Sequence, residues 1–128
     1  MTVMLRTQNF QAYELKCKCG CGKLNYDNLF LMKLEVFRYL LGSRLEVTSG
    51  CRCIKHNQAA EGKKNSCHIC EGRAATAVDI SPLDTGCLNV FILAVKTGFF
   101  NEVIWYKTRN FIHLGVDKNQ KEPYYEII

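Results

Sequence analysis

The stretch from Ser49 to Ser81 constrains the fold of this chain more than any other part of the sequence. It contains two of the three histidines, His56 and His68, and four of the eight cysteines. Asp79 ends a run of small apolar residues there, and the third histidine, His113, follows much later inside the apolar segment FIHLG. Two histidines and one carboxylate with an open fourth position form the ligand set of a catalytic zinc ion. A metal site at His68, Asp79 and His113 is therefore one interpretation, and a hydrogen-bonded core histidine is the alternative for His113.

Length and charge narrow the class of protein. The 128 residues predict a single domain, covering residues 1–128, that is long enough to bury a hydrophobic core. The formal net charge of +5 suits an anionic partner. The sequence has no run of Lys and Arg and no alternation of basic with aromatic residues. We therefore expect no nucleic-acid binding, and we expect the protein to act as a monomer.

The N-terminal residues MTVMLRTQNFQAYE lack the long apolar core of a signal peptide. The longest apolar run, Val90–Val95, is too short to span a bilayer. We therefore expect a soluble chain made in the cytoplasm, without a membrane partner. Eight cysteines in such a chain favour thiols or metal ligands over a disulfide framework.

Apolar periodicity predicts two main helices. Asp27 or Asn28 is a good N-cap for the first, which ends at Gly42. The second covers Leu88–Thr97, after a cap at Asp84 or Thr85, and is apolar nearly all round, so we expect it to be buried. A core-facing stripe is predicted for the first helix at Leu29, Met32, Val36, Phe37, Leu40 and Leu41.

Short alternating or apolar segments predict strands around these helices. A short helix over Ile54–Glu61 and a polar loop from Gly62 to Gly72 separate the first two strands. The order of elements predicts an α+β domain with a small antiparallel sheet and two main helices. The expected strands are Leu45–Ser49, Ala74–Ile80 (ended by Ser81-Pro82), Glu102–Tyr106, Phe111–Val116 and Pro123–Ile128.

The remaining cysteines form a second feature. Three of them alternate with Lys18 and Gly20 in the segment CKCGCG, where a tight turn would point the thiols one way. Another pair directly follows the first predicted strand and can face this turn. The group could hold a structural zinc ion, form disulfides that tie the N-terminus to the core, or consist of packed thiols. A zinc-ribbon module needs Cys-x-x-Cys pairs, and Cys67–Cys70 is the only one. The grouped residues are Cys17, Cys19, Cys21, Cys51 and Cys53.

Several motifs resemble the zinc D-Ala-D-Ala peptidases, a family that includes D,D-carboxypeptidases, D,D-dipeptidases and phage endolysins. The family shares its fold with the hedgehog signalling domain. The resemblance covers about residues 10 to 117, and the CGCG segment is similar to phage-encoded members. The matching positions are Ser49-Gly50-x-Arg52, Asn57, Ser66-x-His68, Gly72-x-Ala74, Asp79 and Phe111-Ile112-His113.

The resemblance implies roles for individual residues. His68, Asp79 and His113 would be the zinc ligands. Arg52 would meet the substrate carbonyl or carboxylate, a role that suits the planar, permanently charged guanidinium. Ser66 would orient the substrate or a ligand. His56 is expected to be structural or exposed.

Two departures from the family pattern concern the site. His68 and Asp79 are eleven positions apart, more than in the family's Ser-x-His-x-x-Gly-x-Ala-x-Asp, so the loop bulges or Cys70 enters the metal shell. Position 110, where the family carries a proton acceptor three residues before the last ligand, is Asn110, and an amide cannot act as a general base.

Three acidic residues are candidates for the missing base, and Glu102 is our choice because strand pairing could bring it beside the metal. Asp117 and Glu71 are the others.

The resemblance therefore implies a zinc metallopeptidase that hydrolyses peptide bonds of bacterial peptidoglycan, with the stem peptide as substrate and zinc as cofactor. It would be a D-Ala-D-Ala carboxypeptidase or an endolysin-type endopeptidase, and the similarity to phage-encoded members favours a phage origin. The alternative is a catalytically degenerate module of the same fold that binds zinc and acts by binding a protein or peptide.

Overall fold

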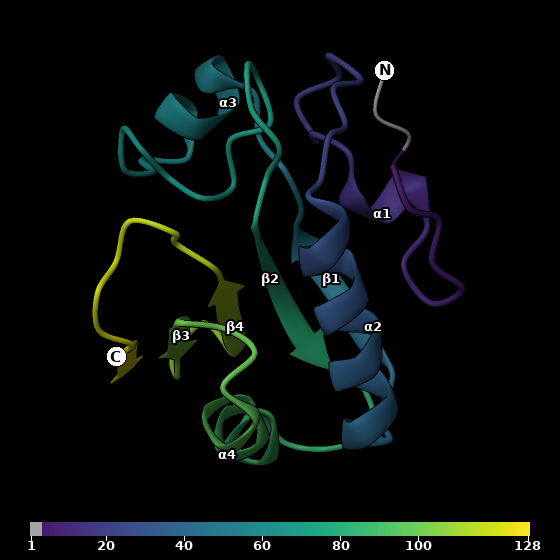
Figure 1. Ribbon diagram of the computed structural model, residues 1–128, viewed down its shortest axis with the longest axis vertical. Coiled ribbons are helices and arrows are strands. Elements are labelled where there is room, and N and C mark those ends of the chain that lie inside the picture. Colours follow the sequence, from purple (N-terminus) through teal and green to yellow (C-terminus); the bar gives the residue numbers. More distant parts are fainter. Residues whose placement is uncertain (1–3) are drawn as a thin grey trace.

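A computed structural model describes residues 4–128 of the chain. The fold is built on a five-stranded sheet, with α4 packed against β3 and β4 and with α2 in contact with α4 (Figure 1). α3 lies near the end of the sheet where β2 begins (Figure 1). The helices are α1 (Ala12–Leu15), α2 (Asn28–Leu41), α3 (Ile54–Ala59) and α4 (Cys87–Thr97). The strands are β1 (Leu45–Ser49), β2 (Ala77–Pro82), β3 (Glu102–Tyr106), β4 (Phe111–Gly115) and β5 (Tyr124–Ile127).

The α+β class with two main helices is confirmed, and the sheet has the order β1-β2-β4-β3-β5. Three of its pairings are antiparallel, but β5 runs parallel to β3, so the expectation of an antiparallel sheet is wrong at this edge. Both edges of β4 are already paired, with β2 and β3. The chain that leaves β4 therefore reverses and pairs with the free edge of β3, in the direction of β3.

The bounds of α2 follow its predicted caps, but the helix buries a different face from the predicted one. The Asp27 carboxylate accepts a hydrogen bond from Phe30 N at 3.0 Å, and Gly42 ends the helix with a left-handed φ of 71°. The Phe30 and Phe37 rings pack edge-on against Phe100, at 5.8 and 5.6 Å between centroids. The buried residues are Phe30, Leu31, Leu34 and Phe37, whereas Leu29, Met32, Val36 and Leu40 of the predicted stripe are exposed.

α4 also differs from expectation, because it packs on one side only. Val90 and Ala94 are fully buried, whereas Leu88 and Ile92 are 53% and 42% exposed. Its N-cap is Gly86, without a side-chain cap, in place of Asp84 or Thr85. Asp84 instead forms a two-pronged ion pair with Arg44, at 2.9 and 3.1 Å.

β2 is shifted relative to the predicted strand. Its last residue is Pro82, beyond the predicted break, and the pairing with β1 continues through the bond from Leu83 N to Arg44 O at 2.9 Å. A proline is tolerated there because it ends the strand. The residues before β2 pair elsewhere, since Ala75 forms a parallel bridge with Tyr26.

The two faces of the sheet have different partners, because side chains alternate along each strand. Apolar residues of one face belong to the hydrophobic core with α2 and α4: Val78, Ile80, Val103, Ile112 and Leu114. The opposite face carries Asp79, Glu102 and His113, which brings the predicted site residues to one side of the sheet. None of the helices in residues 4–128 has the length and apolar character needed to cross a membrane.

Candidate metal centre

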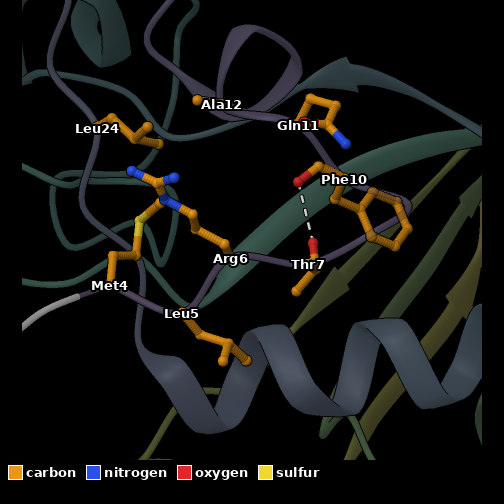
Figure 2. Close-up of a pocket in the computed structure, with 8 residues that line it drawn as sticks. All are labelled: Met4, Leu5, Arg6, Thr7, Phe10, Gln11, Ala12 and Leu24. Atoms are coloured by element: carbon orange, nitrogen blue, oxygen red, sulfur yellow. Dashed lines mark hydrogen bonds between the residues drawn. The ribbon is translucent and has the colours of Figure 1, made fainter.

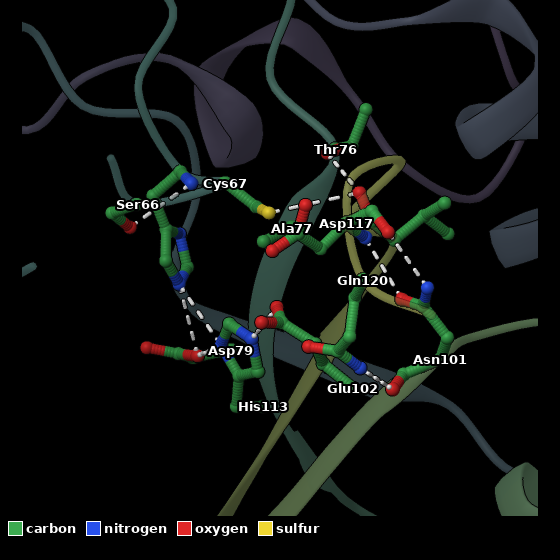
Figure 3. Close-up of polar contacts among 12 residues, drawn as sticks. Ser66, Cys67, Thr76, Ala77, Asp79, Asn101, Glu102, His113, Asp117 and Gln120 are labelled. Carbon is green, nitrogen blue, oxygen red and sulfur yellow. Dashed lines mark hydrogen bonds and ion pairs between the residues drawn. The ribbon is translucent and has the colours of Figure 1, made fainter. Parts of the chain in front are cut away.

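Three ligand-type atoms from distant segments meet on the face opposite the core. The register of β2 and β4 places Asp79 directly across from His113, and His68 reaches them from the loop that precedes β2. Asp79 Oδ1 lies 3.2 Å from His68 Nε2 and 3.1 Å from His113 Nδ1, and these two nitrogens are 3.3 Å apart (Figure 3). Zinc bonds of about 2.0–2.1 Å in tetrahedral geometry separate their ligand atoms by about 3.3 Å. The spacing of the three atoms therefore suits one metal ion.

The other nitrogen of each imidazole has a hydrogen-bond acceptor as its partner. His68 Nδ1 lies 2.8 Å from the Gly50 carbonyl oxygen, and His113 Nε2 lies 3.0 Å from Glu102 Oε1. Because a carbonyl and a carboxylate only accept, these two nitrogens carry the protons. The lone pairs of His68 Nε2 and His113 Nδ1 then face the Asp79 carboxylate, and three converging acceptors call for a cation. Such partners on ligand histidines are typical of metal sites.

The electrostatics of the three side chains agree with this arrangement. Burial acts to raise the pKa of the Asp79 carboxyl, but His68 and His113 together hold it well below its usual range. Burial lowers the pKa of His113, but the carboxylates of Asp79 and Glu102 outweigh it and raise the pKa to about 9. The metal-free site therefore attracts a proton, which a metal ion would displace.

Arg52 lies at the edge of the three-ligand cluster, with 13% of its side chain exposed. Its Nη2 is 3.5 Å from Asp79 Oδ2, and its Nε donates to Ser49 Oγ at 3.2 Å. Its Nη1 contacts Asn57 Oδ1 at 3.4 Å. The backbone of Arg52 also donates to the His68 carbonyl oxygen at 2.7 Å. Ser49 and Asn57 are motif positions to which the sequence assigned no role, and the structure shows that they hold Arg52.

The family model described as Peptidase M15 matches residues 8–115. The chain belongs to the M15 peptidase family. This confirms the resemblance to the zinc D-Ala-D-Ala peptidases, which in general depend on zinc. The matched residues include the three-ligand cluster and Arg52. A comparison with curated proteins found no match.

Glu102, the predicted base of this M15 peptidase, contacts the far side of a ligand ring. Its carboxylate accepts from His113 Nε2, whereas the atom that faces the cluster is His113 Nδ1. The hydrogen bond from His113 lowers the pKa of Glu102, against the opposing effect of burial. Gly115 leaves room for this contact, because a Cβ there would lie 2.5 Å from Glu102 Oε1. The geometry favours an orienting role for Glu102 over the role of a base.

The other candidates for the base have structural partners. Glu71 Oε1 accepts from Ile54 N at 3.0 Å at the start of α3. Asp117 Oδ1 accepts from Asn119 N at 3.0 Å within a turn. Asn110, at the family's base position, has a left-handed φ of 56° and ends the turn between β3 and β4. Asparagine tolerates this conformation better than most residues, so position 110 serves the turn.

Ser66 and His56 lie apart from the metal-facing atoms. Ser66 Oγ accepts from His68 N at 3.2 Å, which shapes the loop that presents His68 (Figure 3). His56 is half-buried on α3, and its backbone N–H contacts Cys53 Sγ at 3.3 Å. Ser66 thus shapes the loop that presents His68, and its contact with a substrate or its role in orienting a metal ligand stays a prediction.

Tyr106 is a residue that sequence reasoning missed. It lies on the same face of β3 as Glu102, four positions along, and its ring stacks on Phe111 at 4.6 Å between centroids. Burial raises the pKa of Tyr106, and the negative charge of Asp79 raises it further. Tyr106 thus lies on the same face of the sheet as Asp79, Glu102 and His113. The spacing of two strand repeats from Glu102 is the signal that could have revealed it.

The long separation between His68 and Asp79 is absorbed by a loop that packs on the N-terminal part of the chain. Cys70 is buried in the hydrophobic core, where its thiol neighbours that of Cys51. Ala75 N donates to Asn25 O at 2.9 Å. Cys70 thus lies in the core beside Cys51, which does not support its predicted entry into the metal shell.

The other cysteines form a separate cluster. Cys17, Cys19, Cys21 and Cys53 bring their sulfur atoms within 4.8 Å of one another. Cys51 does not join them, because its thiol faces Lys23 O, at 3.5 Å, and Cys70. The grouping of Cys51 with these four is the part of the prediction that the structure corrects.

A cavity of about 510 Å³ lies near the N-terminus (Figure 2). Its walls include Met4, Leu5, Phe10 and Leu24, and Arg6 supplies a charge. Since its lining holds no histidine, cysteine or carboxylate, it is not a candidate for metal chemistry.

Proposed function

We propose that this M15 family member is a zinc-dependent peptidase that hydrolyses an amide bond in the peptide part of bacterial peptidoglycan. The observation that carries the proposal is the convergence of three ligand-type atoms on the face of the sheet opposite the core. His68 Nε2, Asp79 Oδ1 and His113 Nδ1 lie 3.1–3.3 Å from one another. Three protein ligands with a free fourth position are typical of catalytic zinc and not of structural zinc. The stem peptide is the expected substrate, because the family acts on D-Ala-D-Ala bonds.

Each ligand has a partner that prepares it for zinc. The Gly50 carbonyl fixes the tautomer of His68, and the Glu102 carboxylate fixes that of His113. Asp79 contributes the negative charge, since its pKa lies well below its usual range. A zinc ion held there would polarise a carbonyl and make hydroxide available from water near neutral pH.

Arg52 would bind the substrate's carbonyl or terminal carboxylate beside the metal. Its guanidinium is held by Ser49 and Asn57 and lies 3.5 Å from Asp79 Oδ2. A donor preorganised in this way stabilises negative charge as it develops on the reacting amide. The net charge of +5 also favours an anionic cell-wall polymer.

A second candidate function is a binding module that has lost catalysis. One observation favours it: Asn110 occupies the family's base position and serves the turn, with its carbonyl oxygen accepting from Ser81 Oγ at 2.8 Å. A module of this kind would hold zinc and a peptide without cleaving the peptide.

Mass spectrometry of peptidoglycan fragments separates the two functions. The protein, with its zinc content measured beforehand, is incubated with stem peptides and with cross-linked fragments, in the presence and absence of a chelator. Release of D-Ala or opening of a cross-link that stops with the chelator supports the peptidase and identifies the bond. Intact substrates after incubation with zinc-loaded protein would overturn the peptidase in favour of the binding module.

A further inference from the structure

The cysteine cluster has the geometry of a second metal site. Cys19 Sγ lies 3.5 Å from Cys17 Sγ and 3.6 Å from Cys53 Sγ, and the sulfur of Cys21 completes the group within 4.8 Å. Four thiolates around zinc, with bonds of about 2.3 Å, have their sulfurs about 3.8 Å apart. The observed spacing is close to this value and is well beyond the roughly 2.05 Å of a disulfide.

The backbone around the cluster supplies hydrogen bonds to sulfur. Cys53 N donates to Cys17 Sγ at 3.4 Å, Lys23 N donates to Cys21 Sγ at 3.4 Å, and His56 N donates to Cys53 Sγ at 3.3 Å. A thiol is a weak acceptor, whereas a thiolate is a strong one. Three of the four sulfurs thus each face a backbone N–H, the kind of supporting hydrogen bond that surrounds metal ligands.

Glycines give the turn its shape. Gly20 and Gly22 have φ values of 95° and 74°, which residues with a Cβ rarely adopt. Gly20 lies between Cys19 and Cys21 and Gly22 directly follows Cys21, and the turn that they shape brings the thiols at 17, 19 and 21 close to Cys53. The motif CKCGCG is thus a local device that gathers three ligands in five residues.

Packed thiols explain the cluster less well. Cys17 and Cys53 are buried, but Cys19 and Cys21 are exposed, and thiols that only pack belong in the interior. The flanking charges also suit metal binding, because four thiolates and a zinc ion leave a net negative charge. Positive residues within two positions of these four cysteines are Lys16, Lys18, Lys23, Arg52 and Lys55, with no Asp or Glu among those neighbours.

We propose that Cys17, Cys19, Cys21 and Cys53 bind a second zinc ion, which is structural. All four coordination positions are filled by protein ligands, so this ion has no place for substrate. Its effect is to clamp the turn of residues 17–23 to the start of α3, where Cys53 is the N-cap. Cys53 directly follows Arg52, so the clamp anchors the segment that carries the substrate-binding cation.

Metal counting tests this proposal independently of peptidase activity. Zinc per chain is measured in protein purified under reducing conditions, for the wild type and for Cys19→Ser, Cys21→Ser and His68→Ala. Cys19 and Cys21 are exposed, so the serine variants leave no buried void. Cys87→Ala is the matched control, since Cys87 contacts Asn110 Oδ1, away from the cluster.

The expected result is about two zinc ions in the wild type and the control, and about one in each of the three other variants. X-ray absorption of the His68→Ala protein should then show four sulfur neighbours at about 2.3 Å. This measurement needs no cysteine substitution, so a folding defect in the serine variants cannot hide the answer. Zinc content unchanged by Cys19→Ser, nitrogen or oxygen neighbours in the His68→Ala spectrum, iron in place of zinc, or disulfides among the four cysteines would each overturn the proposal.

The counts also separate this proposal from the proposed function. A wild-type protein with one zinc ion that is lost in Cys19→Ser but kept in His68→Ala would support the thiolate site and contradict the histidine site.

Discussion

The histidine–aspartate cluster and the cysteine cluster both adjoin Arg52, but they are assembled in different ways. His68, Asp79 and His113 come from a loop and two strands, and up to 45 positions separate them in the sequence. Three of the four cysteines come from a single turn of five residues, and only Cys53 is distant. The first cluster exists only when β2 and β4 pair, whereas most of the second is local.

The two clusters also differ in the types of donor atom that they offer. The histidine cluster offers three hard or borderline donor atoms with Arg52 beside them, which is the number of protein ligands typical of catalytic zinc. The cysteine cluster has four soft donors and no open position, which suits tight, structural binding. The comparison shows that one small fold can gather ligand-type side chains of two different kinds, one group on its sheet and one in an adjacent loop.

Loss of a histidine ligand should have the largest effect. His68→Ala removes one of three ligands from the open site, so peptidase activity should fall by several orders of magnitude because the source of hydroxide is lost. The zinc content per chain should fall but retain the thiolate-bound ion. Cleavage of peptidoglycan fragments measures the loss of activity. His56→Ala is the control, since His56 lies outside the cluster, and it should change neither quantity. Full activity in His68→Ala would contradict a catalytic role for the histidine cluster.

Arg52→Lys should lower kcat/KM by about 10²–10³-fold, the cost typical of losing a preorganised donor in the transition state. Lysine keeps the charge but replaces the planar fork, whose nitrogens reach Ser49, Asn57 and Asp79 separately, with a single ammonium nitrogen. Zinc content should not change, because Arg52 is not a ligand. Arg44→Lys is the matched control, as Arg44 pairs with Asp84 on the surface, with 66% of its side chain exposed. An equal loss in both variants would contradict a substrate-binding role.

Glu102→Gln should weaken zinc binding at the histidine site by about 10–100-fold, as expected for the loss of a carboxylate that orients a ligand histidine. Activity should recover at saturating zinc, which separates an orienting carboxylate from a base. Glu46→Gln, at an exposed position of β1, serves as the control. Activity that stays low with zinc fully bound would instead restore Glu102 as the proton acceptor.

Gly115→Ala offers an independent test of the same contact. The added Cβ would lie 2.5 Å from Glu102 Oε1 and 2.9 Å from His113 Nε2, so the two side chains must shift. Zinc affinity should fall, and by less than in Glu102→Gln, because both groups remain. Gly86→Ala is the control, since a Cβ there meets nothing within 4 Å.

The zinc affinity of the histidine site should also depend on pH, by about tenfold per pH unit. Burial lowers the pKa of His113, but Asp79 and Glu102 raise it to about 9 in the metal-free protein. Below that pH, zinc must displace a proton, so affinity rises with pH and levels off near 9. Competition with a chelating dye between pH 6.5 and 8.5 measures the slope.

The same shift makes a statement about stability. The folded pKa of His113 lies above its unfolded value, so protonation stabilises the metal-free protein below about pH 6.5. This contribution is lost as pH rises through about 9, and the thermal midpoint of the metal-free protein should fall across that window. A midpoint that rises instead would place the proton elsewhere.

The candidate site was predictable to the extent that it consists of residue types at motif positions. His68, Asp79, His113 and Arg52 were named from the sequence, and the structure brings them together. The assignment of His68, Asp79 and His113 as zinc ligands stays a prediction. The side of His113 that Glu102 contacts could not be predicted, because it depends on the register of β3 against β4 and on the space above Gly115.

The sequence by itself determined the local features of the fold. The cap at Asp27 and the left-handed Gly42 set the ends of α2, and both act through bonds to their own helix. The strand Glu102–Tyr106 was also placed correctly, as was the strand Leu45–Ser49. These features depend on residues a few positions apart, so a single stretch of sequence contains their causes.

The tertiary structure alone decided which face of α2 is buried, which cysteines lie together and how β5 pairs. α2 has two apolar faces, and the one with Phe30 and Phe37 is buried because Phe100 packs against it. Cys51 lies beside the Cys70 thiol in the core instead of joining the other cysteines. β5 pairs parallel with β3 because β4 has no free edge. Each of these choices depends on a partner far along the chain, so no local pattern in the sequence could determine it.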